Sequence, residues 1–128
     1  MTSSQDVSAE GEPRGLVLHV LSQEPGAEER ALRGAFRSAV NAQADLPSGT
    51  QLEIVVQGAA VVALAAGSSL AGDVAGLEQA GVRILACSNS LASAGLDAAR
   101  LMESIAVASS AVGQVTRRQW LGWAYVRF

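Results

Sequence analysis

The sequence predicts an α/β domain built around a mostly parallel, five-stranded sheet. Several short apolar runs show no alternation of polar and apolar residues, which is typical of strands buried on both faces. Segments with helical spacing separate these runs, and this alternation indicates βαβ units with right-handed crossovers. The chain has 128 residues and is 49% hydrophobic but only 4% aromatic, so we expect one domain whose core consists of small, closely packed side chains.

The first half of the chain supplies two strands and two helices. The run "GLVLHVLS", residues 15–22, predicts the first buried strand. Residues 27–45 then repeat apolar side chains at helical spacing until "LPSG" ends the helix. The run "QLEIVVQG", residues 51–58, predicts the second strand. The alanine-rich residues 59–67 predict a short helix rather than a strand.

The second half continues the alternation. Its predicted elements are a helix over 69–81, a strand over 82–87, a helix over 94–101, a strand over 104–108, a helix over 109–119 and a final strand over 122–128. Between the third strand and the next helix, "SNS" predicts a polar turn. Residues 1–14 are polar and contain Gly and Pro, so we expect a disordered leader before a folded domain over 15–128.

Composition excludes several classes of function. The net charge is −3, which gives no electrostatic footprint for nucleic acid. All nine basic residues are Arg, so Schiff-base chemistry and a P-loop lysine are excluded. One cysteine cannot form an internal disulfide, no apolar stretch is long enough for a membrane span, and the N-terminus lacks the pattern of a signal peptide. We therefore expect a cytoplasmic protein that does not enter a membrane.

Cys87 is the only cysteine and the main candidate for chemistry. It ends the third predicted strand, as Gly58 ends the second, and ligands of parallel sheets bind outside the carboxyl ends of strands. Backbone N–H groups after Cys87, together with Ser88, Asn89 and Ser90, can stabilise a thiolate there. The alternative is that the thiol is packed and acts only as a small apolar group.

His19, the only histidine, lies within the first predicted strand. It can pair with Cys87 as a base only if the first and third strands are neighbours; otherwise it is packed or hydrogen-bonded within the sheet. One Cys and one His cannot supply the ligands of a zinc site unless subunits share it, so no metal is expected. Neither a GxGxxG nor a GxxxxGK[ST] motif stands at a strand–helix junction, so no cofactor is expected.

Three segments, taken in order, resemble the DsrE/DsrF-like family of small sulfur-relay proteins. They are "LEIVVQGAAVVAL", "GVRILACSNSL" and "QWLGWAYVRF". The first resembles the family's second strand, glycine turn and helix. The second is similar to its strand ending in Ala-Cys-x-Asn-x-Leu, and the third to its terminal Gly-Trp-Ala-Tyr. The resemblance covers residues 15–127, essentially the whole folded part.

The resemblance implies a three-layer α/β/α sandwich, related to flavodoxin-like folds, with a mostly parallel five-stranded sheet. It implies that Cys87 accepts sulfane sulfur as a persulfide and passes it to a partner protein. Gly58 and Asn89 match positions close to that cysteine. The resemblance also implies a homotrimer, a homohexamer or a mixed hexamer, with sulfur donor and acceptor proteins as partners.

The C-terminal segment gathers Trp120, Trp123 and Tyr125 within six residues. These side chains can pack an edge strand on the terminal helices, or they can form a subunit interface, where aromatic residues are enriched. Stacking on a cofactor is a third interpretation, but no phosphate motif accompanies it. We expect the segment to contribute to an interface between copies of the chain.

These observations leave three hypotheses for function. The first is a cytoplasmic sulfur carrier or sulfurtransferase that uses Cys87. The second is a non-catalytic, oligomeric binding or scaffold module in which Cys87 is inert. The third is a small hydrolase or reductase with a Cys87–His19 pair, although nothing in the sequence orients the histidine.

Overall fold

Five parallel strands form the central layer of the protein. They are β1 (Gly15–Ser22), β2 (Gln51–Gly58), β3 (Arg83–Cys87), β4 (Ala106–Ala108) and β5 (Ala124–Arg127). Their order across the sheet is β4-β3-β2-β1-β5, and each of the four pairings is parallel. The computed structural model describes residues 14–22, 24 and 26–128, so the expected leader lies outside the described residues apart from Arg14.

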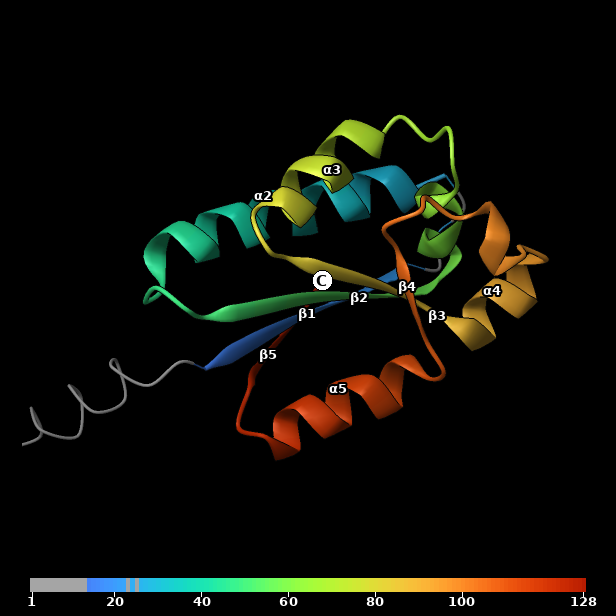
Figure 1. Cartoon of the computed structure of the whole chain (residues 1–128). Coiled ribbons are helices and arrows are strands. Elements are labelled where there is room, and N and C mark those ends of the chain that lie inside the picture. Colours follow the sequence, from blue (N-terminus) through green and yellow to red (C-terminus); the bar gives the residue numbers. More distant parts are fainter. Residues whose placement is uncertain (1–13, 23, 25) are drawn as a thin grey trace, which may run out of the picture.

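Helices cover both faces of this sheet, which confirms the three-layer α/β/α sandwich (Figure 1). On one face lie α2 (Glu28–Asp45) and α3 (Ala71–Gln79), and on the other lies α5 (Ala111–Trp120). The remaining helical segments are α4 (Ser88–Ala94) and the 3-10 turns η1 (Ala59–Leu64) and η2 (Ala98–Arg100). In the described part of the chain, no helix has both the length and the apolar character needed to cross a bilayer.

The helix predicted over 94–101 is wrong. The structure has α4 starting at Ser88, directly after β3, where the sequence predicted only a polar turn. Gly95 ends this helix in the left-handed conformation, with φ of 66° and ψ of 28°, which glycine adopts without steric cost. Beyond it, Asp97 accepts a hydrogen bond from the Ala99 N–H at 2.9 Å and caps only the short η2.

The two faces of the sheet carry different chemistry. The face toward α2 and α3 is packed with Leu, Val, Ile, Ala and Phe side chains that form the larger core. The face toward α5 has a smaller apolar cluster, made of Val17, Val55, Leu85, Cys87, Ala108, Ala111 and Val115. The buried polar side chains His19 and Glu53 also lie on this second face. The polar groups of the sheet are therefore on the α5 side.

A buried carboxylate holds α5 to the sheet. Glu53 of β2 is only 3% exposed and accepts a hydrogen bond from Gln114 Nε2 at 2.9 Å. Arg118 Nη2 forms an ion pair with the same carboxylate at 2.5 Å, and Arg83 lies farther away at 3.5 Å. The Arg118 guanidinium also stacks 4.5 Å from the centre of the Trp123 ring. The ion pair with Glu53 and the contact with Trp123 therefore hold α5 next to the smaller apolar cluster.

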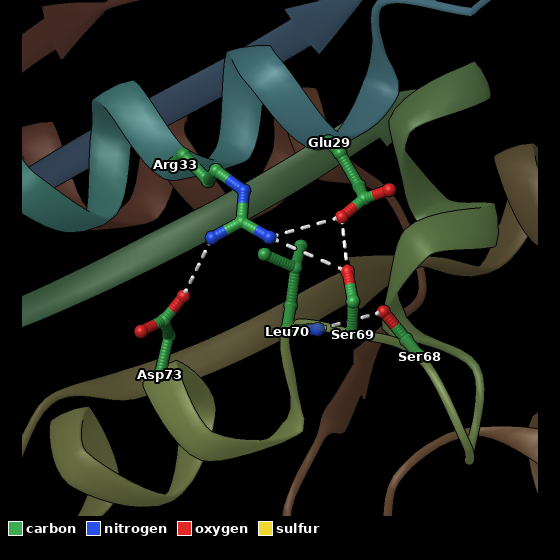
Figure 2. Close-up of polar contacts among 6 residues, drawn as sticks. All are labelled: Glu29, Arg33, Ser68, Ser69, Leu70 and Asp73. Carbon is green, nitrogen blue, oxygen red and sulfur yellow. Dashed lines mark hydrogen bonds and ion pairs between the residues drawn. The ribbon is translucent and has the colours of Figure 1, made fainter.

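The opposite layer is joined by an exposed polar cluster. Arg33 of α2 pairs with Glu29 at 3.2 Å and with Asp73 of α3 at 3.4 Å (Figure 2). Ser69 donates a short hydrogen bond to the Glu29 carboxylate, so the loop before α3 is tied to the first turn of α2. These groups are about half exposed, so their contribution to stability is modest.

Candidate functional site

A cleft opens at the carboxyl ends of β2 and β3. It has a volume of about 550 Å³ and lies between the residues that follow these strands and the start of α5. This is the edge at which ligands bind in parallel sheets. Besides the thiol of Cys87, its polar lining consists of Glu28, Gln57, Asn89, Ser90, Ser93 and Ser110. Among these lining residues Glu28 alone is charged, so the cleft offers mainly hydroxyl and amide groups.

Cys87 is the last residue of β3 and directly precedes α4. It is 3% exposed and packs in the smaller apolar core, yet it also lines the cleft. Burial raises the pKa of the Cys87 thiol, but the Ser90 hydroxyl and the backbone N–H groups of Ser90, Ala111 and Asn89 outweigh it and lower the pKa below its ordinary value. Since the thiolate is the nucleophilic form, the surroundings favour reaction at this sulfur.

Ser90 links the thiol to the neighbouring strand. The Gly58 N–H donates to Ser90 Oγ at 2.8 Å, which leaves the Ser90 hydroxyl proton available for the Cys87 sulfur. Gly58 has φ of 76° and ψ of −155°, a conformation that essentially only glycine adopts. A Cβ at this position would lie 2.7 Å from the Ser22 carbonyl oxygen. The backbone turn that presents this N–H therefore requires glycine.

A row of polar side chains crosses the same face of the sheet. His19 of β1 is 6% exposed and makes two hydrogen bonds of 2.7 Å, through Nδ1 to the Tyr125 hydroxyl and through Nε2 to Gln57 Oε1. Gln57 follows Val56, which pairs with Ala86 in the β2–β3 register, so Gln57 lies beside Cys87. The row therefore runs from the β5 edge of the sheet to the cleft.

The structure brings some of the predicted site residues together and separates others. Gly58, Cys87 and Asn89 all line the cleft, whereas Ser88 is exposed and is not part of its lining. The condition for a direct pair between His19 and Cys87 is not met, because β2 lies between β1 and β3. The histidine approaches the cleft only through Gln57.

The aromatic residues of the tail have different surroundings. Trp120 is 81% exposed at the end of α5, and the Tyr125 hydroxyl is hydrogen-bonded to His19. Trp123 lies over Gly15, where a Cβ would be only 1.9 Å from the indole ring. Trp123 therefore packs on β1, and glycine is needed beneath it.

Sequence reasoning gave no role to Gln57, Ser110 or Glu53. One signal was present for two of them, since Glu53 and Gln57 interrupt the apolar residues of β2, and buried polar groups require partners. Ser110 gave no comparable signal. It becomes part of the site because it caps α5, accepting from the Gly113 N–H at 3.0 Å. Within residues 14–22, 24 and 26–128, no group of three or more Cys, His, Asp or Glu residues could hold a metal ion.

Comparisons with solved structures find the same fold in proteins from three organisms. MTH1491 from Methanobacterium thermoautotrophicum, described as a protein of unknown function, is 37% identical, with a TM-score of 0.78 over 90% of this chain and 99% of that chain. The ychN protein from E. coli is 18% identical, with a TM-score of 0.70 over 90% and 99% of the two chains. BT1422 from Bacteroides thetaiotaomicron, also of unknown function, is 18% identical, with a TM-score of 0.64 over 88% and 94%. Comparisons with protein-family models and with curated proteins find no match.

Proposed function

Since the chain belongs to the same family as MTH1491, we propose that it is a DsrE-like sulfur carrier that holds sulfane sulfur as a persulfide on Cys87 and passes it to a partner protein. The observation that carries this proposal is a single thiol whose pKa is lowered by the groups around it and which lines a cleft at the carboxyl edge of the sheet. The resemblance of the segments around Gly58, Cys87 and the C-terminal strand to DsrE/DsrF-like proteins supports it.

The transfer needs only thiol chemistry. The Cys87 thiolate attacks the outer sulfur of a donor persulfide, R–S–SH. A sulfur–sulfur bond forms on Cys87, the donor's sulfur–sulfur bond breaks, and the donor leaves as the thiolate R–S⁻ while the proton stays on the transferred sulfur. In the second transfer, the thiolate of an acceptor attacks the outer sulfur of the Cys87 persulfide, and Cys87 leaves as its thiolate. No net oxidation occurs, so a single cysteine is sufficient.

The lining of the cleft is compatible with this chemistry. A thiolate that is already favoured needs no general base, and His19 is not positioned to act as one. The hydroxyl and amide groups of the cleft can accommodate a sulfur atom beyond Cys87 without a fixed cation. The alternative function, a binding or scaffold module, requires instead that the thiol be inert, and the lowered pKa argues against that.

We also propose that the protein works as a homo-oligomer. The support is the C-terminal segment, where Trp120 and Leu121 are 81% and 70% exposed and every residue of the edge strand β5 is exposed. Large exposed apolar groups next to an open sheet edge favour association. The sulfur donor and acceptor are proposed to be separate proteins that reach the cleft at the carboxyl ends of β2 and β3.

Intact-mass spectrometry tests the sulfur-carrier proposal. The wild type and Cys87→Ser are incubated with glutathione persulfide, and a gain of one sulfur atom is expected in the wild type alone. In parallel, the rate of iodoacetamide alkylation is followed against pH, and a midpoint below about 8.5 is expected. If the wild type gains no sulfur and is alkylated only after unfolding, Cys87 is a packed residue and the scaffold function is correct.

A further inference from the structure

We propose that Gln57 donates a hydrogen bond to the terminal sulfur of the Cys87 persulfide, and that His19 and Tyr125 are positioning residues that hold its amide in the donating orientation. This inference rests on the sulfur-carrier function proposed above and assigns residues to it that sequence reasoning left without a role. In the polar row on the α5 face of the sheet, two hydrogen bonds of 2.7 Å join three strands.

The partner of Nε2 indicates which tautomer His19 adopts. Gln57 turns its carbonyl oxygen, Oε1, toward Nε2 of the ring, so Nε2 must carry a proton and donate it. In the tautomer with its proton on Nε2 alone, Nδ1 accepts from the Tyr125 hydroxyl, which lies 2.7 Å away. When the Tyr125 hydroxyl donates to Nδ1, it favours the tautomer that binds the carbonyl end of Gln57, although Tyr125 lies on the other side of His19 from the cleft.

This arrangement leaves the NH₂ end of Gln57 free for the cleft. The side chain is half-buried and lines the cleft, and its carbonyl end is occupied by the histidine. Gln57 and Cys87 also follow the paired residues Val56 and Ala86 on adjacent strands, which are spaced about 4.8 Å apart in a sheet. The orientation of the amide matters, because a flipped amide would present a carbonyl oxygen, which repels an anionic sulfur.

A persulfide places its charge one atom beyond the groups that stabilise the thiolate. The terminal sulfur lies about 2 Å beyond Sγ, whereas the Ser90 hydroxyl and the surrounding backbone N–H groups act on Sγ itself. Glu28, the acidic residue of the cleft lining, offers a carboxylate acceptor and no fixed donor for an anionic sulfur. A neutral donor among the cleft residues would therefore stabilise the charge on the terminal sulfur.

Among the neutral donors that line the cleft, Gln57 has its carbonyl end hydrogen-bonded to the buried His19. Asn89 and Ser93 are exposed. The Ser110 hydroxyl accepts from the Gly113 N–H and keeps its proton, as Ser90 does, but it is positioned by a backbone cap rather than by a buried side chain. Gln57 is fixed by a buried histidine that is fixed in turn by a tyrosine. A donor held in place before the charge arrives stabilises it more than a donor that must first be ordered. The polar row is thus interpreted as a positioning device rather than as a set of satisfied buried groups.

The tautomer of His19 gives the first test, and it does not depend on sulfur transfer. The chain has one histidine, so the imidazole ¹⁵N signals in a two-dimensional NMR spectrum belong to His19 without ambiguity. We expect the Nε2–H tautomer in the wild type and a shifted Nδ1 signal in Tyr125→Phe, which removes only the hydroxyl. A wild-type ring protonated at Nδ1 would mean that Gln57 presents its carbonyl to the cleft, and the proposal would be wrong.

The second test measures the persulfide itself. Wild type, Gln57→Leu, Gln57→Glu and the control Gln79→Leu are loaded with glutathione persulfide, and alkylation of the persulfide and of the unloaded thiol is followed against pH. Gln79 is an exposed glutamine of α3, on the opposite side of the sheet. We expect the persulfide midpoint to rise by about one pH unit in Gln57→Leu, the size of one hydrogen bond to a charged group, with the midpoint of the unloaded thiol unchanged.

The outcomes separate this inference from the function on which it rests. If Gln57→Leu and Gln57→Glu load with sulfur and show the midpoint of Gln79→Leu, Gln57 makes no bond to the terminal sulfur and the inference fails while the carrier function stands. If the wild type does not load at all, the carrier function fails and the inference falls with it. If the Gln57 variants do not fold, Tyr125→Phe tests the same proposal. This variant loses one remote hydroxyl, and a smaller rise in the persulfide midpoint is expected from it.

Discussion

At Cys87, two opposing effects determine how reactive the thiol is. Burial is the largest single influence and raises the pKa, because a charged sulfur loses its solvation. The Ser90 hydroxyl and three backbone N–H groups favour the charged form, and together they prevail. The thiolate fraction near neutral pH is therefore larger than that of an unperturbed cysteine, whose pKa is about 8.5.

Ser90→Ala tests the largest of the favourable contributions. Loss of the hydroxyl should raise the pKa of the Cys87 thiol, so the pH midpoint of alkylation moves upward. The rate near pH 7 should fall several-fold, whereas above the new midpoint both proteins are fully ionised and their rates should converge. Ser93→Ala is the matched control, since Ser93 lines the cleft one turn later in the same helix. Equal midpoints for the two variants would show that Ser90 does not act on the sulfur.

Gly58→Ala tests the turn that presents a backbone N–H to Ser90. The positive φ and the 2.7 Å approach to the Ser22 carbonyl oxygen both oppose a side chain, so we expect a loss of about 3 kcal/mol in the free energy of unfolding. Gly67→Ala is the control, because Gly67 also has a positive φ, of 87°, but open space around it, and about 1 kcal/mol is expected there. Urea unfolding measures both values, and similar losses would mean that the contact with Ser22 is unimportant.

At the scale of elements, α5 depends on one buried carboxylate. Glu53 accepts bonds from Gln114 and Arg118, both on α5, while Arg83 reaches it from the neighbouring strand at 3.5 Å. Removing one partner of a buried pair leaves the other charge without compensation, which costs about 3–5 kcal/mol. Because α5 carries Ala111 and follows Ser110, its attachment also shapes the cleft.

The comparison of Glu53→Ala with Arg83→Ala tests this attachment. Glu53→Ala should lower the free energy of unfolding by about 3–5 kcal/mol, whereas Arg83→Ala should cost at most about 1 kcal/mol, because the Arg83 side chain is 55% exposed. Urea unfolding followed by circular dichroism measures both. Equal losses would show that the ion pair to α5 is no more important than the surface contact.

Elements were more predictable from the sequence than their junctions. The strands at 15–22, 51–58 and 82–87 and the long helix at 27–45 were recognised because buried parallel strands are continuous apolar runs and an amphipathic helix has a clear period. The helix α4 was missed because Ser and Asn residues after a strand are typical of turns as well as of first helical turns. Only the structure showed that the chain passes into a helix immediately after Cys87.

The candidate site was predictable only in part, for a related reason. Cys87 and Gly58 could be placed at one edge of the sheet from strand ends alone. The role of Gln57 depends on strand order, since β2 lies between β1 and β3 and joins a distant histidine to the cleft. Strand order is a property of long-range pairing, and no local pattern in the sequence encodes it.

At the scale of the whole molecule, large apolar side chains are exposed at the C-terminal end of the described residues. Trp120 and Leu121 end α5, and Val126 and Phe128 of the edge region are 44% and 39% exposed. Trp123 differs from these residues because it packs on Gly15 and stacks with Arg118. Substituting Trp123 would therefore disturb the fold together with any interface, and Trp120 is the better probe of association.

Trp120→Glu should dissociate the proposed homo-oligomer. A charge in place of an exposed indole opposes burial against a second copy but removes little from the fold, because Trp120 is 81% exposed. Light scattering on a size-exclusion column should give a multiple of 13.1 kDa for the wild type and a smaller mass for the variant. Val40→Glu is the control, since Val40 is also exposed but lies on α2, across the sheet from α5, and its oligomer should persist. A monomeric wild type, or the same mass for all three proteins, would mean that the apolar C-terminal surface does not join copies of this chain.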